Sequence, residues 1–337
     1  MSYLEKLLNG VEVEWKPLAH KEYGVAELSR GRVMSKEYLA DNAGEYPVYS
    51  SQTANNGEIG KIKTFDHDGE AVTWTTDGAN AGTVFHRTGK FSITNVCGLI
   101  KVKNIEELNY KFLFYWLSIE AKKHVYSGMG NPKLMSNQMA KIPIPIPPLS
   151  VQKEIVRILD SFTELTAELT AELTARKKQY NYYREKLLSF EDGEVEWKTL
   201  GEVALIGTGK HDTQDAVDNG DYIFYARGIS PLKLDTYDFE ETAIITAGDG
   251  VGVGKVFHWA VGKYALHQRA YRIVPNEKEI NPRYVYHYIV TNFYSYIEKT
   301  SVSSSVTSMR KPMFLKFPIP IPSLEEQERI VSILDKF

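Results

Sequence analysis

The chain has 337 residues, of which 43% are hydrophobic and 25% charged, and its formal net charge is -3. This length allows two domains, each with its own hydrophobic core, and the composition is that of an ordinary globular protein. The charge excludes a chain that is basic throughout, although one face could still be basic enough to bind nucleic acid. No apolar run is long enough to span a bilayer, and the single cysteine, Cys97, excludes an internal disulfide. We therefore expect a cytoplasmic protein with Cys97 in its core.

The first half of the chain predicts a domain of mixed strands and helices. β-Branched and aromatic residues indicate strands at residues 71–76, 84–86 and 98–102. An aromatic-rich run indicates a helix at residues 109–121, with its aromatic side chains in a core. Turn-rich polar segments at residues 50–57 and 127–133 predict exposed loops.

The centre of the chain predicts a long helix that comes after a proline ladder. Proline alternates with isoleucine over residues 142–149, which forbids a helix and predicts an extended, polyproline-like segment. From residue 149 to 189, apolar side chains then recur at three- and four-residue intervals, as in a helix with one apolar seam. Such a helix would be about 60 Å long, so we expect it to act as a spacer. The seam consists of Ile155, Ile158, Phe162, Leu165, Leu169, Leu173, Tyr180, Tyr183 and Leu187.

The second half of the chain repeats the first. A second proline ladder at residues 317–324 precedes the same helix start, and the motif Glu-Val-Glu-Trp-Lys occurs at residues 12–16 and 194–198. Residues 244–258 correspond to residues 74–86, whereas the polar loops differ. A shared scaffold with divergent loops is expected of two domains that recognise two different targets. An old duplication with neutral loop drift is the alternative.

The sequence lacks a convincing enzymatic motif. The glycine-rich residues 248–256 have the wrong spacing for a phosphate loop, and Val256 stands where serine or threonine would bind Mg²⁺. There is no Asn-Pro-Pro-aromatic motif of the kind with which amino-methyltransferases hold a flipped base. The histidines, including His86 and His258 at corresponding positions, show no metal-ligand spacing. We therefore predict no catalytic residue and no metal site.

The repeated motifs resemble those of one family. Pro-Ile-Pro-Ile-Pro occurs in both halves, and each copy leads into Leu-x-x-Gln-x-x-Ile-Val-x-Ile-Leu-Asp-x-Phe. Thr-Ala-Glu-Leu repeats fill residues 163–175, and residues 176–184 form a basic and aromatic run. Together these motifs resemble the specificity subunit of type I restriction-modification systems, and in particular the IC type with its repeat-length central helix. The resemblance covers essentially the whole chain.

The resemblance implies an α+β fold in four parts. Two target recognition domains, at residues 1–148 (with a conserved remnant at 1–18) and 190–323, would each recognise one half of a split DNA sequence. The spacer helix at residues 149–189 would set the gap, since one added Thr-Ala-Glu-Leu unit lengthens a helix by about 6 Å and rotates the next domain by roughly 40°. Residues 324–337 would begin a second conserved helix whose continuation is missing. The seam would then pair with a neighbouring chain or a partner subunit.

The resemblance also implies partners. The chain would be the non-catalytic subunit that binds double-stranded DNA, with two methyltransferase subunits docked on its helices and motor and nuclease subunits added for restriction. S-adenosylmethionine, ATP and Mg²⁺ are expected in those partners, and no cofactor in this chain. The alternatives are a helix-mediated scaffold or antagonist that does not recognise DNA, and an enzyme with a cryptic site. Salt-sensitive, sequence-selective DNA binding would distinguish the specificity subunit from the scaffold.

Side-chain chemistry selects the candidate DNA contacts. Arginine and lysine bind phosphates and guanine, and asparagine and glutamine bind adenine edges. In the first domain the candidates are Arg30, Arg32, Lys36, Ser51, Gln52, Asn55, Asn56, Lys61, Asn80 and Lys133. In the second domain they are Lys210, His211, Gln214, Arg227, Lys233, Lys255, Ser303, Ser304, Arg310 and Lys311.

Overall fold

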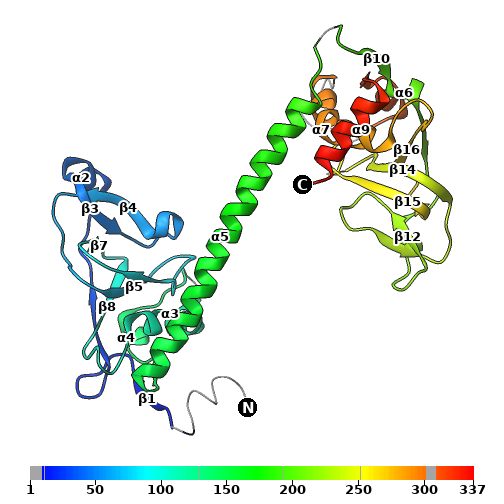
Figure 1. Ribbon diagram of the computed structural model, residues 1–337. Helices are drawn as coiled ribbons and strands as arrows, with labels where there is room; N and C mark the ends of the chain where they lie inside the picture. The colour runs from blue at the N-terminus through cyan, green and yellow to red at the C-terminus, as the bar shows by residue number, and fades with distance from the viewer. Residues whose placement is uncertain (1–9, 11, 129, 192, 251, 301–308) are drawn as a thin grey trace. The chain divides into compact units, whose positions relative to one another are not determined.

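The computed structural model describes residues 10, 12–128, 130–191, 193–250, 252–300 and 309–337 (Figure 1). The chain divides into two compact units, Met1–Glu168 and Leu169–Phe337, each with its own sheets and buried core. In both units a run of mostly antiparallel strands is followed by helices, which confirms the predicted α+β class.

The first unit is built on a four-stranded antiparallel sheet. In spatial order its strands are β2 (Ala26–Arg30), β8 (Cys97–Val102), β5 (Ala71–Thr75) and β6 (Val84–Arg87). Helix α3 (Tyr110–Glu120) packs on β5 and β6, and Trp74, Ile100 and Leu113 are fully buried in the core that helix and sheet share. These elements confirm the strands and the aromatic helix predicted for the first half, with ends that differ by one or two residues. The short helices η2 (Ala121–His124) and α4 (Ser136–Met139) come after α3.

A smaller sheet supports the first polar loop. Strand β3 (Ala43–Tyr49) pairs antiparallel with β4 (Glu58–Ile62) and parallel with β7 (Ser92–Ile93), and helix α2 (Lys36–Asp41) precedes β3. Residues 50–57 connect β3 to β4 and end in the turn η1 (Ala54–Gly57). Asn55 and Asn56 have φ angles of 48° and 55°, a conformation that asparagine tolerates better than most residues. The predicted exposed loop is therefore confirmed as a hairpin connection.

The proline ladders are strands. Strand β9 (Pro143–Ile146) pairs antiparallel with β1 (Glu14–Pro17), which places Trp15 opposite Pro145. In the second unit β17 (Pro318–Ile321) pairs in the same way with β10 (Glu196–Thr199). The two repeated motifs are thus the two strands of one ribbon in each unit. The expected extended backbone is confirmed, but the polyproline-like interpretation is wrong, because a two-stranded ribbon has a free edge on which proline needs no N–H.

A buried glutamine explains why Leu-x-x-Gln is repeated. The Gln152 Oε1 accepts a hydrogen bond from the Asn109 N–H at 2.9 Å, and its Nε2 donates to the carbonyls of Glu107 and Pro147, both at 2.8 Å. Gln327 makes two of these bonds in the second unit: its Oε1 accepts from the Asn281 N–H and its Nε2 donates to the Pro322 carbonyl, both at 2.8 Å. The repeated glutamine therefore ties the helix in which it lies to the end of the proline ladder and to the start of the aromatic helix.

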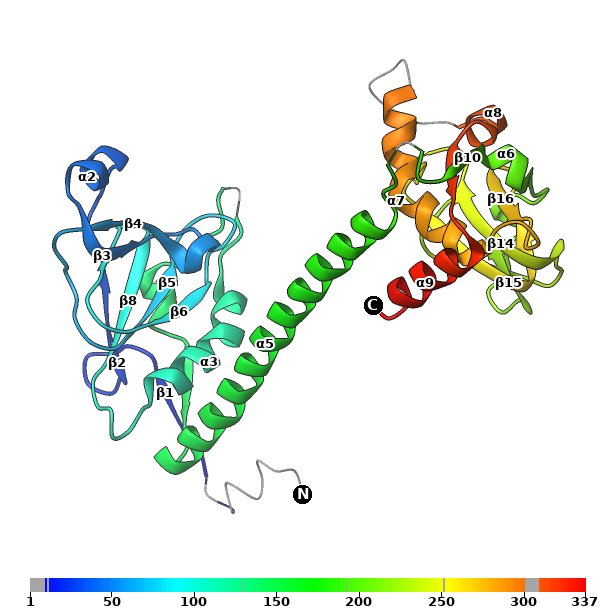
Figure 2. The ribbon, with the colours of Figure 1, turned by 45° about the horizontal axis from the view of Figure 1, so that its top comes forward.

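Helix α5 (Leu149–Leu187) is continuous over 39 residues (Figure 2). At 1.5 Å per residue it is about 60 Å long, as predicted. Its first turns belong to the first unit and its last turns to the second. Of the predicted seam, Ile155 and Ile158 are half-buried in the first unit, and Tyr180 and Leu187 pack against the core of the second. The exposed members are Phe162, Leu165, Leu169, Leu173 and Tyr183.

The second unit repeats the strand order of the first. Its sheet contains β11 (Ala204–Thr208), β16 (Ala270–Pro275), β14 (Phe239–Ala247), β15 (Phe257–Leu266), β12 (Tyr222–Tyr225) and β13 (Leu232–Leu234), in this order. The first four correspond to β2, β8, β5 and β6. Strand β15 then continues to pair in parallel with β12, as β7 does with β3. One sheet replaces two because β15 runs on through Gly262, whereas the first unit turns at Gly89 between β6 and β7.

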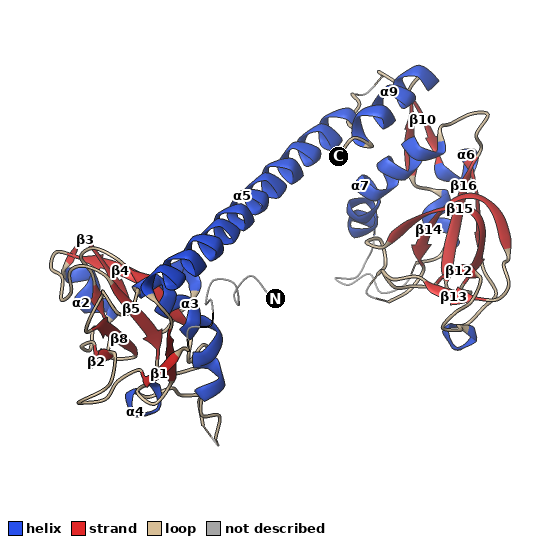
Figure 3. Ribbon diagram, turned by 60° about the horizontal axis from the view of Figure 1, so that its bottom comes forward, coloured by secondary structure: helices blue, strands red, loops and turns tan. Residues whose placement is uncertain are grey.

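Helices complete the second unit (Figure 3). The long helix α7 (Pro282–Thr300) corresponds to α3 and contributes Tyr284, Ile289 and Phe293 to the core. The remaining helices are α6 (Leu200–Val203), η3 (Thr213–Asp215), α8 (Lys311–Leu315) and α9 (Leu324–Leu334).

Candidate nucleic-acid interface

Each unit has an Asp-Gly turn at the end of an equivalent strand. Asp77 and Gly78 come after β5, and Asp249 and Gly250 come after β14. The φ angles of Gly78 and Gly250 are 92° and 81°, a backbone conformation that glycine adopts at little cost. The two carboxylates therefore occupy equivalent places in the repeat, and in both units cations gather around them.

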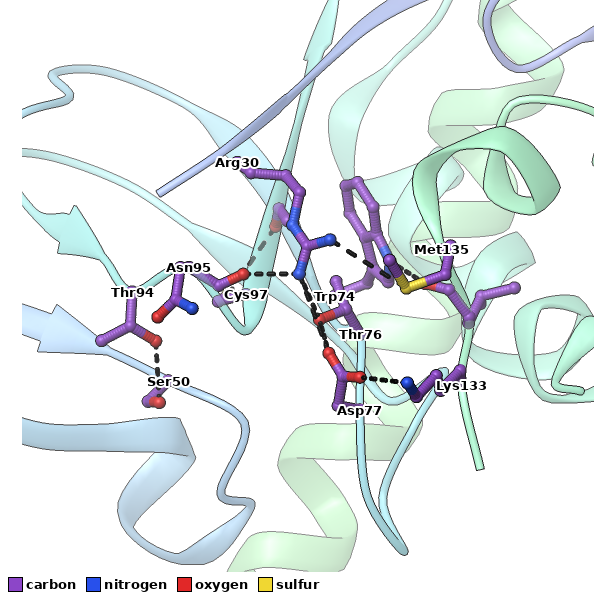
Figure 4. A network of polar contacts seen from close by, with 12 residues as sticks. Arg30, Ser50, Trp74, Thr76, Asp77, Thr94, Asn95, Cys97, Lys133 and Met135 are labelled. Atoms are coloured by element: carbon purple, nitrogen blue, oxygen red, sulfur yellow. Dashed lines mark hydrogen bonds and ion pairs between the residues drawn. The ribbon is translucent and has the colours of Figure 1, made fainter. Parts of the chain in front are cut away.

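In the first unit, Asp77 lies between two cations (Figure 4). The Arg30 Nη2 is 3.7 Å from one carboxylate oxygen and the Lys133 Nζ is 4.0 Å from the other. The same Arg30 nitrogen donates to the Thr76 hydroxyl at 3.0 Å and to the Asn95 carbonyl at 2.5 Å. Arg30 is thus bound to its own domain and stabilises the turn, whereas the Lys133 side chain is 53% exposed and freer to bind a phosphate.

The loop at residues 50–57 is joined to this cluster. The Ser50 and Thr94 hydroxyl oxygens are 2.8 Å apart, and Thr94 precedes the residue that binds Arg30 (Figure 4). Of the loop candidates, Ser51 and Gln52 are half-buried, whereas Asn55 and Asn56 are exposed. The start of the loop is therefore tied to the turn that binds Arg30, and its far end presents two exposed amide side chains.

The other candidates of the first unit lie on separate elements. The Arg32 Nε is 3.0 Å from an Asp66 carboxylate oxygen, and its Nη1 donates to the Tyr38 hydroxyl at 3.0 Å. Three further candidates are exposed: Lys36 at the start of α2, Lys61 on β4 and Asn80 in the turn after Asp77.

In the second unit, Asp249 joins two arginines. Its carboxylate accepts hydrogen bonds from the Arg227 Nη1 at 2.8 Å and from the Arg269 Nη1 at 3.0 Å. Burial disfavours the ionised carboxylate, but these bonds outweigh it and hold the pKa of Asp249 below its usual range. An open cavity of about 450 Å³ adjoins the group and is lined by Arg227, Asp249, Thr213 and Ser230 among others. Asp249 thus orients two guanidinium groups, and that of Arg227 lines the cavity. Such groups are suited to contacts with phosphate or guanine.

The other candidates of the second unit are more dispersed. Lys210 and His211 both contact the carboxylate of Asp238, at 3.2 and 3.1 Å. The Lys255 ammonium lies 4.8 Å from the centre of the Tyr294 ring. The remaining exposed candidates are Gln214 in η3, Lys233 on β13, and Arg310 and Lys311 at the start of α8. Ser303 and Ser304 lie outside the described residues.

Sequence reasoning missed two arginines. Arg269 occupies the turn before β16, the counterpart of the Asn95 turn before β8, and its significance comes from the contact with Asp249 that the fold creates. Arg87 is 3% exposed, and its guanidinium carbon lies 3.6 Å from the centre of the Tyr49 ring. Local sequence patterns do not indicate a buried arginine, because its environment is made by distant strands.

Two further observations concern the described part of the chain. No group of three or more His, Cys, Asp or Glu side chains there could hold a metal ion, and no helix there is long and apolar enough to cross a membrane. The His86 Nε2 is 2.6 Å from the Glu70 carboxylate, and the His258 Nε2 is 3.0 Å from the Gly228 carbonyl.

Comparisons with known proteins agree with this architecture. The family model of the type I restriction modification DNA specificity domain matches residues 12–176 and 193–337. A putative type I specificity subunit of Mycoplasma pneumoniae is 34% identical over 331 residues, which cover 94% of this chain and 88% of the relative. A type I restriction enzyme specificity subunit of Escherichia coli is 33% identical over an alignment that covers 100% of this chain and 89% of the relative.

A solved structure shows the same fold. The crystal structure of a type I restriction-modification S subunit from M. genitalium has a TM-score of 0.72 and 17% sequence identity, and the match covers 100% of this chain and 92% of that one. The chain belongs to the DNA specificity subunits of type I restriction-modification systems, which are non-catalytic components of these enzymes.

Proposed function

We propose that this specificity subunit recognises a bipartite DNA sequence, one half with each unit, through surfaces centred on the Asp77 and Asp249 turns. The supporting observation is the repeat itself. Both units have the same strand order and the same carboxylate with two cations, yet the surrounding polar side chains differ. Equivalent scaffolds with different polar loops are suited to two different half-sites.

The two turns favour different contacts. In the second unit Asp249 holds Arg227 and Arg269 in place, so each guanidinium can meet a guanine edge or a phosphate without first losing much conformational freedom. In the first unit Asn55 and Asn56 offer amide groups for adenine edges, and Lys133 offers a phosphate contact. The other candidates add exposed charges around these centres.

The remaining parts of the chain have supporting roles in this proposal. Residues 1–148 and 190–323 are the recognition domains, residues 149–189 are the spacer of an IC-type subunit, and residues 324–337 begin the second conserved helix. Two methyltransferase subunits dock on the helices, with the exposed leucines of α5 as their apolar contacts. These partners and the motor subunits supply S-adenosylmethionine, ATP and Mg²⁺, in the cytoplasm. The exposed seam also fits the alternative, a scaffold that pairs helices without recognising DNA.

The test is to sequence methylated adenines in DNA from cells that express the chain with its cognate methyltransferase subunit. A second variant carries one additional Thr-Ala-Glu-Leu unit after Leu173. The proposal requires a split motif whose two halves stay the same while the gap lengthens, because the insertion changes only the spacer. A complex that assembles but leaves no split motif would favour the scaffold.

Two variants distinguish a phosphate contact in the first unit from base recognition by the second. Lys133→Ala should weaken binding almost uniformly, because phosphate contacts are not specific to sequence. Arg269→Ala should relax one half-site only and leave the other unchanged. If Arg269→Ala relaxed the recognition of both half-sites, the assignment of one half-site to the second unit would be wrong.

A further inference from the structure

An apolar groove in the first unit has no partner among the described residues. It lies between α3, the ribbon of β1 and β9, and the start of α5, and its volume is about 400 Å³. Trp15, Trp116, Ile119, Ile155 and Leu159 are among the residues that line it. Trp15 is 55% exposed and Ile119 67% exposed. Apolar surface gathered in one groove indicates a surface on which another segment packs.

The repeat identifies the corresponding place in the second unit. Asp160 at the start of α5 contacts Lys111 of α3 at 2.6 Å, and Asp335 after α9 contacts Arg283 of α7 at 2.9 Å. The start of α5 therefore lies on α3 as α9 lies on α7. On this alignment Ile155 and Leu159 of the groove correspond to Ile330 and Leu334.

The corresponding surface of the second unit is covered. Ile330 and Leu334 are 0% and 2% exposed, whereas their counterparts in the groove are half-buried. The cover is the end of α5 and the residue after it, because Leu188 belongs to the same buried cluster as Ile330 and Leu334, and Leu187 packs against that cluster. The Tyr183 ring lies next to the Phe337 ring, with centroids 5.9 Å apart.

The segment that covers the second unit has a near-identical copy at the start of the chain. Residues 183–188 read Tyr-Arg-Glu-Lys-Leu-Leu, and residues 3–8, which lie outside the described residues, read Tyr-Leu-Glu-Lys-Leu-Leu. Each precedes a Glu-Val-Glu-Trp-Lys motif, and that motif supplies the first strand of the ribbon in both units. The two segments therefore have the same place in the repeat.

We propose that residues 3–8 of this chain occupy the groove of the first unit, as residues 183–188 cover the second. Leu7 and Leu8 then cover Ile155 and Leu159, and Tyr3 contacts Phe162, the counterpart of Phe337. The one difference between the copies supports this fit, since an apolar Leu4 replaces Arg184 next to an apolar groove. The proposal is independent of DNA recognition and makes the beginning of the chain part of the core of the first unit.

The test is a cross-link in the full-length chain. Tyr3→Cys and Phe162→Cys are combined and treated with a short bis-maleimide, and the products are separated on a denaturing gel and mapped by mass spectrometry. The control pair is Tyr183→Cys with Phe337→Cys, whose rings are in contact in the structure. The native Cys97 is 2% exposed and should not react in the folded protein.

We expect a cross-link within one chain for both pairs. A Tyr3–Phe162 link that joins two chains would overturn the proposal and identify a second copy as the occupant. A control that links while the Tyr3–Phe162 pair does not would also overturn it and leave the groove to another subunit. Deletion of residues 2–8 should further speed amide exchange in α3 and at the start of α5, with no change in α7 and α9; unchanged exchange in α3 would contradict the proposal.

Discussion

Replacement of Gln152 by leucine tests how the repeated motif holds the first unit together. The side chain is fully buried and makes three hydrogen bonds of 2.8 to 2.9 Å, with the Asn109 N–H and the carbonyls of Glu107 and Pro147. Leucine has a similar size but leaves all three groups unpaired. The Pro147 bond is fully buried, while the other two are partly buried. An orphaned buried group costs about 1–3 kcal/mol, so we expect Gln152→Leu to destabilise the first unit by about 2–4 kcal/mol.

The assay is urea unfolding combined with amide hydrogen exchange, which assigns the loss to one unit. Gln327→Leu is the matched variant, since Gln327 makes the equivalent bonds with the Asn281 N–H and the Pro322 carbonyl. Each variant should speed exchange in its own unit and leave the other unchanged. A loss below about 0.5 kcal/mol for Gln152→Leu would refute the reasoning, because it would show that the three groups find other partners at little cost.

Three other side chains each lead to a prediction. Burial lowers the pKa of His287 and outweighs the opposing effect of Asp335, so the unfolded chain binds the proton more readily than the folded chain. The free energy of unfolding should therefore be highest above about pH 6.5 and should decrease as the pH falls through the folded pKa. The decrease should be smaller in His287→Gln, and urea midpoints across this pH range will measure it. Burial raises the pKa of the Cys97 thiol to about 12, so iodoacetamide should alkylate it only after unfolding; rapid alkylation of the folded chain would contradict its burial. Arg269→Ala should cost about 1–3 kcal/mol of DNA binding at one half-site, measured by titration with half-site variants, and an equal loss on every sequence would make Arg269 a phosphate contact.

The amino-acid sequence by itself determined the repeat, the fold class and most of the elements. The aromatic helix and the strands of the first unit are set by local periodicity. The Thr-Ala-Glu-Leu run favours a long helix because alanine, glutamate and leucine, which make up nine of its thirteen residues, are good helix formers. These features depend on neighbours within a few residues. They could be predicted without knowing which distant segments meet.

Only the tertiary structure decided which polar groups remain available for DNA. Arg30 was an obvious candidate, but strands brought together from distant parts of the chain supply Thr76 and Asn95 as its acceptors. Arg269 became a candidate because the same kind of convergence places it on Asp249. The pairing of the Trp15 motif with the proline ladder is likewise non-local. Local propensity fixes an element, whereas burial and hydrogen bonding between distant elements fix the role of each side chain.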